Sequence, residues 1–238
     1  MNEKKQGRRS AQDAEKTKFE ILRIASELFC ELGYERVSLR HISEKAGVSH
    51  SLIRHHFGNK ETIWHCISDN LHAFIERYMR VVYQHIAADN PANVKLYIFS
   101  TRMLAYMLTF KQPVQLIADA VRQEDALLDY FIDSAGEVES FVNEVAEEYN
   151  RDFPHSPIKI WEMKWQMLLY AHGAASLTPF LQETWADEEA ELEQCLLKHW
   201  MLYEEMLAIR LNVTESNRLT PKSIGELIYD LPCCGNEN

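Results

Sequence analysis

Polar and basic side chains that suit the recognition of an anion gather in one short stretch, from Ser38 to Lys60. Arginine can form a bidentate pair with a guanine base. Serine hydroxyls and the free backbone N–H groups at a helix N-terminus bind phosphate oxygens. These residue types therefore favour binding of a phosphate-bearing polymer over catalysis. The candidate residues are Ser38, Arg40, Ser49, His50, Ser51, Arg54, His55 and Lys60.

Patterns that bring catalytic or metal-binding groups together are absent from the sequence. No Glu has a His three residues later, as di-iron carboxylate sites in helical bundles require. The H-E-x-x-H, G-x-S-x-G and P-loop patterns are also missing. The 5 cysteines show no C-x-x-C spacing, and the adjacent pair Cys233-Cys234 is either a redox element or part of a solvated tail. We therefore expect no enzymatic activity, no metal and no cofactor.

Charge is unevenly distributed along the chain. The whole sequence carries a formal net charge of −11. Residues 1–65 nevertheless hold 12 basic and 9 acidic side chains, whereas the remaining residues hold 13 basic and 27 acidic ones. Only the N-terminal part is thus suited to lie against phosphates, because a strongly acidic body is repelled by them. This distribution argues against a non-specific, architectural DNA-binding protein.

The stretch that holds the candidates has the pattern of three helices. Apolar residues recur at helical spacing over residues 16–32, and Gly33 ends this first helix. Ser38 can cap a short second helix, Gly47 ends it, and Ser49 can cap a third. Two short helices joined by a tight turn and braced by a longer one make a helix-turn-helix. Its expected core is Ile24, Leu28, Leu39, Ile42, Val48, Ile53 and Phe57.

We call the helix-turn-helix part of the chain, residues 16–65, the head. After it, the sequence predicts a larger helical part, the body. Only 8 residues are Gly and 7 are Pro, and alternating strand patterns are absent. The expected helices cover residues 60–88, 91–110, 114–132, 136–151, 158–177, 187–212 and 221–230. We therefore expect an all-α chain with a flexible arm at 1–15, a helix-turn-helix domain at 16–65, a helical body at 66–230 and a tail at 231–238.

The order of residues in the head resembles the TetR family of regulators, over about residues 17–65. The features in fixed order are Ala25, Leu28-Phe29, Gly33-Tyr34, Ser38-Leu39-Arg40-His41-Ile42-Ser43, Ala46-Gly47-Val48-Ser49, Ile53, His55-His56-Phe57 and Asn59-Lys60-Glu61. The resemblance implies a DNA-binding head, an all-helical ligand-binding body and a two-fold dimer. Arg54 departs from the family, which usually has a tyrosine there. Its guanidinium can replace a tyrosine–phosphate contact or reach a base edge.

The side-chain chemistry and the resemblance together suggest roles within the head. Ser38 and Ser49 suit phosphate oxygens, and Arg40 corresponds to a family position that can read a guanine. The remaining candidates are the base readers His50, Ser51 and Arg54 and the phosphate contacts His55 and Lys60. A lysine in the first turn of a helix opposes the helix dipole by roughly 0.3–1 kcal/mol, so a nearby phosphate would explain Lys60.

Aromatic and methionine side chains recur at helical spacing in the body. In the resembled family such helices enclose a ligand cavity, and flexible methionines beside aromatic walls suit an apolar or aromatic effector. The candidate lining residues are Phe99, Met103, Tyr106, Met107, Phe110, Trp161 and Trp165. An ordinary helical core is the alternative for any one of them. The identity of the effector does not follow from the sequence.

The resemblance also implies a dimer interface, which we call the dimer seam. The helices at about 158–177 and 187–212 are expected to pair with their symmetry mates in a four-helix bundle. The small residues at 173–176 permit close approach of helices. Apolar contacts are expected from Leu192, Leu196, Met201 and Leu207.

These features together predict a homodimeric, cytoplasmic transcriptional regulator that acts as a repressor. Two heads would engage half-sites about one helical turn apart, or a multiple of it, on double-stranded operator DNA of quasi-palindromic sequence. A small effector would shift the dimer away from the DNA-competent state. The alternative is a helix-turn-helix protein that acts mainly as a protein-interaction module. Because the longest uncharged run, residues 165–182, is too polar for a membrane span, we expect no membrane association.

Overall fold

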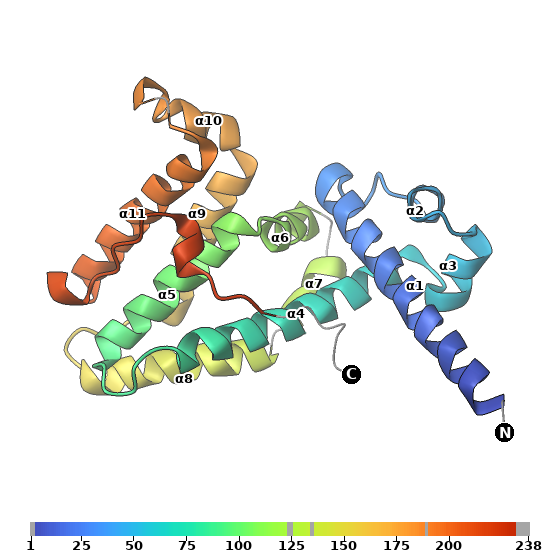
Figure 1. Ribbon diagram of the computed structural model, residues 1–238. Helices are drawn as coiled ribbons and strands as arrows, with labels where there is room; N and C mark the ends of the chain where they lie inside the picture. The colour runs from blue at the N-terminus through green and yellow to red at the C-terminus, as the bar shows by residue number, and fades with distance from the viewer. Residues whose placement is uncertain (1–2, 123–125, 134–135, 189, 232–238) are drawn as a thin grey trace. The chain divides into compact units, whose positions relative to one another are not determined.

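Every regular element in the described part of the chain is a helix, which confirms the predicted all-α class (Figure 1). The computed structural model describes residues 3–122, 126–133, 136–188 and 190–231. The α-helices are α1 (Glu3–Leu32), α2 (Leu39–Ala46), α3 (His50–Phe57), α4 (Lys60–Gln84), α5 (Ala92–Thr109), α6 (Gln112–Arg122), α7 (Ala126–Asp133), α8 (Gly136–Asp152), α9 (Ile160–Ser176), α10 (Thr178–Glu183) and α11 (Leu192–Arg210). The chain also contains three short 3₁₀ helices in its described part: η1 (Ala186–Glu188) between α10 and α11, and η2 (Glu215–Asn217) and η3 (Ile224–Leu227) after α11.

The chain forms two compact units. The first unit comprises residues 1–71 and 116–134, and the second comprises residues 72–115 and 135–238. This division differs from the predicted one after residue 65, because α4 continues unbroken into the second unit and part of α6 packs with the head. Helix α1 begins at Glu3, inside the segment for which the sequence predicts a flexible arm. From residue 232 on, the predicted tail with Cys233-Cys234 lies outside the described residues.

The core of the first unit follows the predicted pattern closely. The buried members of the predicted set are Ile24, Leu28, Ile42, Ile53 and Phe57, and Leu39 and Val48 are half-buried against them. Residues 116–127 add Leu116, Ala120 and Leu127 to this core, which extends it beyond the three predicted helices. Because a fully buried Leu or Ile contributes about 1.5–3 kcal/mol, these additions stabilise the head substantially.

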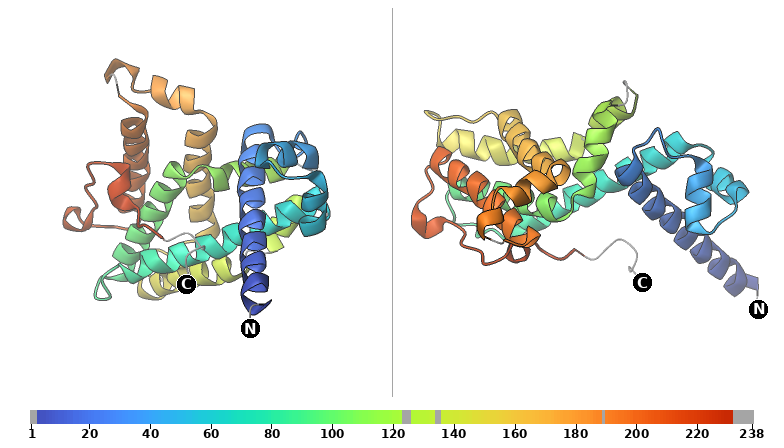
Figure 2. Two further views of the ribbon diagram at one scale, coloured as in Figure 1. Left: turned by 45° about the vertical axis from the view of Figure 1, so that its right-hand side comes forward. Right: turned by 90° about the horizontal axis from the view of Figure 1, so that it is seen from above.

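Helix α5 is the centre of the second unit. Helices α8, α9 and α11 and the 3₁₀ helix η3 all pack against it, and α9 and α11 lie side by side (Figure 2). The largest fully buried side chains of this unit are Trp200, Tyr78, Tyr97, Tyr149 and Tyr203. Two of their polar ends are paired as follows: the Trp200 indole N–H donates to the Thr101 carbonyl at 2.8 Å, and the Tyr97 hydroxyl donates to Glu204 Oε1 at 2.6 Å.

The last described segment crosses α5 without forming an α-helix. We call residues 211–231 the C-terminal strap. The sequence predicts a helix at 221–230, but the strap contains only 3₁₀ turns. The prediction is wrong because polar side chains of the unit bind the strap's backbone and thereby replace helical hydrogen bonds. Within the predicted helix, Arg102 donates to the Leu227 carbonyl and the Tyr78 hydroxyl accepts from the Tyr229 N–H. Before it, Asn93 binds the Leu211 carbonyl and the Tyr97 hydroxyl accepts from the Leu219 N–H.

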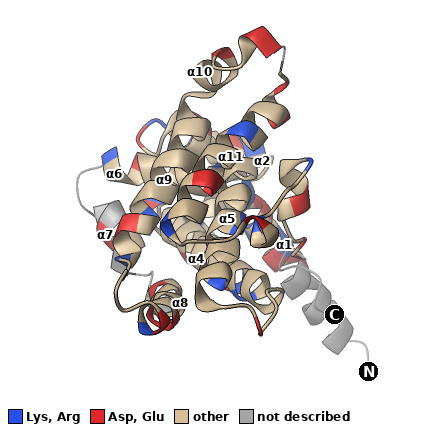
Figure 3. Cartoon of the chain, turned by 90° about the vertical axis from the view of Figure 1, so that its left-hand side faces the viewer, with Lys and Arg blue, Asp and Glu red and all other residues tan. Residues whose placement is uncertain are grey.

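Charged residues are sparse on α9. Its 17 residues include only Glu162 and Lys164 as acidic or basic side chains, and most of its ribbon is uncharged in Figure 3. Helix α8 carries many more carboxylates over the same length. Among the described residues, no helix combines the length and apolarity that a membrane span requires.

Candidate nucleic-acid interface

Two serine-capped helices and a glycine turn form the candidate interface. The Ser38 hydroxyl accepts from the His41 N–H at 3.2 Å, and the Ser49 hydroxyl accepts from the Leu52 N–H at 3.2 Å. Gly47, at φ +66°, adopts a left-handed conformation that costs other residues roughly 1–2 kcal/mol. Both predicted caps are confirmed. Each helix start still presents backbone N–H groups that have no partner within the helix and can meet an anion.

Helix α3 buries one side and exposes the other. Ile53 and Phe57 are buried in the core of the first unit. The candidate residues of α3 are all exposed, namely His50, Ser51, Arg54 and His55. An eight-residue helix with one polar, uncovered side is suited in shape and chemistry to a DNA major groove.

Arg40 projects from α2 into solvent. Its side chain is 81% exposed, and its Nε donates to Glu44 Oε1 at 2.7 Å. The hydrogen bond from Arg40 lowers the pKa of the Glu44 carboxyl. An exposed pair of this kind contributes little to stability. Arg40 can therefore exchange Glu44 for an outside acceptor at small cost.

Lys60 is held within the head by the turn that follows α1. Its Nζ donates to the Tyr34 carbonyl at 2.8 Å and lies 3.9 Å from the centroid of the Tyr34 ring. Burial lowers the pKa of the Lys60 ammonium. The structure thus explains a cation at the start of α4 without a phosphate. A phosphate contact by Lys60 stays a prediction and requires the side chain to leave Tyr34.

A buried carboxylate from α6 holds the same turn from the other side. Asp119 is 8% exposed, and its Oδ2 accepts from the Tyr34 N–H at 2.7 Å. Gly33 adopts φ +82°, and a Cβ there would lie 3.0 Å from Asp119 Oδ1. Asp119 and Lys60 therefore fix both backbone groups of Tyr34. Sequence reasoning missed Asp119, because it lies 85 residues from Tyr34 and no local pattern links the two.

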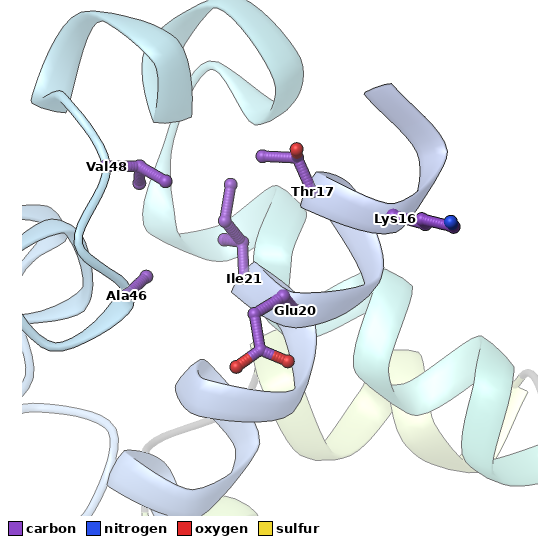
Figure 4. A pocket seen from close by; sticks show the side chains of 6 residues that line it. All are labelled: Lys16, Thr17, Glu20, Ile21, Ala46 and Val48. Atoms are coloured by element: carbon purple, nitrogen blue, oxygen red, sulfur yellow. The ribbon is translucent and has the colours of Figure 1, made fainter. Parts of the chain in front are cut away.

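A hollow of about 280 Å³ lies between α1 and the turn from α2 to α3 (Figure 4). Its lining residues are Lys16, Thr17, Glu20, Ile21, Ala46 and Val48. The Lys16 ammonium points away from Ala46 and Val48 in Figure 4. Lys16 and Thr17, which the sequence did not single out, thus add a cation and a hydroxyl beside the candidate interface. Among the described residues, no cluster of three or more His, Cys, Asp or Glu side chains is placed to hold a metal ion.

The predicted ligand-lining residues of α5 lie at or near the core of the second unit. Phe99, Met103 and Tyr106 are buried, Met107 is half-buried, and Phe110 is exposed at the end of the helix. The Tyr106 ring lies 4.9 Å from that of Phe110, between centroids. The first four of these residues lie on α5, and Phe110 directly follows its last residue. A role of these residues in lining an effector site stays a prediction.

Trp161 and Trp165 do not join that cluster. Both lie on α9 with 61% and 62% of their surface exposed, and Lys164 Nζ sits 3.8 Å from the Trp161 ring centroid. The sequence groups them with the α5 residues because helical spacing shows which residues share a face. Spacing does not show whether that face meets the core of the same chain. A role of these two tryptophans in lining an effector site is not favoured by this placement.

Large exposed apolar side chains instead gather on α9, α10 and α11. They are Trp161, Trp165, Leu169, Leu177, Phe180, Leu192, Met201, Leu202 and Ile209. Of the predicted seam residues, Leu192 and Met201 are exposed and Leu196 is half-buried. Leu207 is fully buried, so its assignment to the seam is wrong. It lies on the side of α11 that packs within the unit.

The head is similar in sequence to known regulatory proteins. The family model of bacterial regulatory proteins of the tetR family matches residues 21–65. The chain is also 35% identical over 65 residues to the HTH-type transcriptional regulator TtgR of Pseudomonas putida, a match that covers 27% of this chain and 31% of TtgR. It thus spans about a third of the length of the curated relatives that it matches.

Solved structures extend the likeness in fold to most of the chain. The fatty acid degradation regulator FadR of Bacillus halodurans matches with a TM-score of 0.60 and 14% identity, over 82% of this chain and 98% of that one. FadR of Bacillus subtilis, solved in complex with stearoyl-CoA, matches with a TM-score of 0.54 and 18% identity, over 79% and 96%. At such identities the likeness shows the fold alone. The likeness to the tetR family of bacterial regulatory proteins is thus one of sequence over the helix-turn-helix head, residues 21–65, and one of fold over most of the chain.

Proposed function

We propose that this chain is a homodimeric transcriptional repressor. Its two heads would bind half-sites of a quasi-palindromic operator, about one helical turn apart or a multiple of it. A small effector with an apolar or aromatic body would bind the second unit and lower the affinity for DNA. The match of the head to a family of regulatory proteins supports the class of function.

One observation carries the proposal, namely the uncovered polar side of α3. The residues of that side have the chemistry to contact bases and phosphates, and Ser49 orients the start of the helix through its cap. Arg40 on α2 adds an exposed guanidinium, which suits bidentate recognition of guanine. We propose the base readers Arg40, His50, Ser51 and Arg54 and the phosphate contacts Ser38, Ser49, His55 and Lys60.

The dimer is proposed to form through α9, α10 and α11. These helices carry most of the large exposed apolar residues of the second unit, and α9 has few charged side chains that would favour its exposure to solvent. Stable interfaces bury about 1,200–2,000 Å² and are apolar at their centre. A two-fold pairing of this surface would place two heads in one molecule, which a palindromic operator requires.

Selection of bound sequences from a random double-stranded DNA pool, followed by sequencing, tests the proposal. We expect enrichment of a two-fold symmetric site. The Arg40→Ala variant should then bind that site about 1–3 kcal/mol more weakly, with relaxed preference at one base position in each half.

Arg23→Ala is the matched control for Arg40→Ala. Arg23 also pairs on an exposed helical surface with a glutamate four residues later, Glu27, but it lies on α1 outside the candidate interface. We expect this variant to bind the selected site as the wild type does. Equal affinity of Arg40→Ala and wild type would refute the assigned base contact. Failure to enrich any sequence would favour the alternative, a protein-interaction module.

A further inference from the structure

Five Lys or Arg side chains of the second unit are half-buried, and four of them pair with a carboxylate. The pairs join Lys95 to Glu148, Lys164 to Glu139, Lys198 to Glu188 and Arg218 to Glu204. The fifth cation is Arg102 on α5, which forms no ion pair with any described residue. Acidic residues are not scarce, since 27 of them lie outside residues 1–65. A half-buried charge without a counter-ion is unusual, because its lost hydration is not offset.

The contacts of Arg102 leave one edge of its guanidinium without an acceptor. Nη1 donates to the Leu227 carbonyl of the strap at 2.8 Å, and the guanidinium carbon lies 4.7 Å from the Tyr229 ring centroid. Nε is buried and has no hydrogen-bond partner among the described residues. The N–H groups of Nε and Nη2 point in parallel from one edge of the planar group. That edge matches the two oxygens of a carboxylate.

Aromatic residues lie near Arg102. Tyr106 follows Arg102 by one helical turn on α5, and its ring lies 4.3 Å from that of Tyr78, between centroids. Burial raises the pKa of Tyr78 to about 12, so its hydroxyl keeps its proton at neutral pH. Two exposed acids flank the strap contacts: Glu226, which accepts from the Lys222 N–H at 3.0 Å, and Asp230, whose charge acts on Tyr78. The surroundings thus combine the Arg102 cation with neutral hydroxyls and aromatic rings, and the charge of the exposed Asp230 also reaches Tyr78 although Asp230 forms no ion pair with Arg102.

The strap covers Arg102 with contacts that an anion can replace. Leu227 offers a neutral carbonyl, and Tyr229 offers the face of a ring that also stacks on His85 at 4.2 Å between centroids. The Tyr229 N–H approaches the Tyr78 hydroxyl at 3.4 Å, which is long for a hydrogen bond. The hydrogen bonds of this segment are thus few, although Leu227 is buried and Ile228 and Tyr229 pack against the core, so a bound anion has to displace apolar contacts as well.

We propose that Arg102 is the anion-binding residue of the effector site and that the effector is an organic carboxylate with an aromatic or aliphatic body. The carboxylate pairs with the Nε–Nη2 edge, and the body lies against the α5 row of Phe99, Met103 and Tyr106. The end of the strap moves aside to admit it. This inference rests on the proposed function only in naming the bound molecule an effector.

Binding of matched acids and amides to the full chain, without DNA, tests the charge preference. The probes are benzoate, 1-naphthoate and decanoate, each beside its neutral primary amide, with thermal unfolding and titration calorimetry as readouts. We expect at least one acid to raise the unfolding temperature and to bind about tenfold or more tightly than its amide. Binding of acid and amide with equal affinity, or of none of the three acids, overturns the proposal.

Arg102→Met and Lys95→Met form a matched pair of variants on α5. Both remove a half-buried cation, but Lys95 already has Glu148 as partner. We expect Arg102→Met to lose the acid preference and Lys95→Met to keep it. Without any ligand, Arg102→Met removes a charge that has no counter-ion but also the donor to the Leu227 carbonyl, so it should lower the unfolding temperature less than Lys95→Met does. If Arg102→Met unfolds as early as Lys95→Met, Arg102 is a structural cation and the proposal is overturned.

These measurements separate the inference from the proposed function. Preferential acid binding that depends on Arg102 supports the site even if no operator is found. Conversely, a chain that binds operator DNA but shows no acid preference keeps its proposed function and loses this site.

Discussion

Replacing Asp119 with alanine should weaken the head far more than a surface substitution would. The change removes the carboxylate that accepts from the Tyr34 N–H at 2.7 Å, in a site where Asp119 is 8% exposed. Hydrogen bonds to charged groups contribute about 1.5–3 kcal/mol, and a half-buried N–H left without a partner adds a desolvation cost. We therefore expect the free energy of unfolding of the first unit to fall by about 2–3 kcal/mol.

Urea unfolding followed by circular dichroism, with hydrogen exchange of the Tyr34 amide, measures this effect. Asp119→Asn should lose about half as much, because it keeps an oxygen that accepts but loses the charge. Tyr130→Phe is the control: it removes the bond between α7 and Asp69 in the same unit, at an exposed site. We expect that variant to lose less than about 1 kcal/mol. If Asp119→Ala were no less stable than Tyr130→Phe, the assigned role of Asp119 would be wrong.

Two further predictions concern the second unit. The hydrogen bonds from Lys95 and then Tyr83 lower the pKa of Glu148, so its stabilising effect should be complete at neutral pH and lost as the pH falls below about 4.5. Urea unfolding of wild type and Glu148→Gln should accordingly differ at pH 7 and converge at low pH; a constant difference would contradict this. If the proposed dimer forms, Trp165→Asp should convert it to monomer in sedimentation velocity, because the change places a charge on the exposed apolar surface of α9, whereas Val121→Asp, exposed on α6, should not. Retention of the dimer by Trp165→Asp would exclude that surface as its centre.

The features that the sequence predicted correctly depend on near neighbours in the chain. Ser38 and Ser49 cap helices because each hydroxyl reaches an N–H three residues later, and Gly47 ends α2 because it accepts a positive φ. The apolar period likewise identifies Ile53 and Phe57 as the buried side of α3. Such interactions lie within four residues, so residue types and spacing are sufficient to find them.

The features that could not be predicted from the sequence depend on contacts between distant segments. A lysine at a helix N-terminus is unfavourable because of the helix dipole, and the sequence therefore suggested that a phosphate balances Lys60. In the structure the ammonium instead donates to the Tyr34 carbonyl, 26 residues away. Periodicity placed Trp165 on an apolar face but could not show that this face is open to a partner. Residues 221–230 have the spacing of a helix, but the Leu227 carbonyl accepts from Arg102, which is 125 residues away and which no local pattern links to it.

The pairing of buried cations also depends on contacts between distant segments and not on the number of acidic residues. The count of carboxylates describes the body as acidic, and that count would lead one to expect a counter-ion near every buried cation. Lys95 and Arg102 lie two turns apart on α5, yet only Lys95 faces an acid, because α8 places Glu148 at one position and the strap places a carbonyl at the other. The packing of these two segments therefore decides which cation is satisfied within the chain. The one that is left with an unused donor edge is the one that can bind an acid from outside.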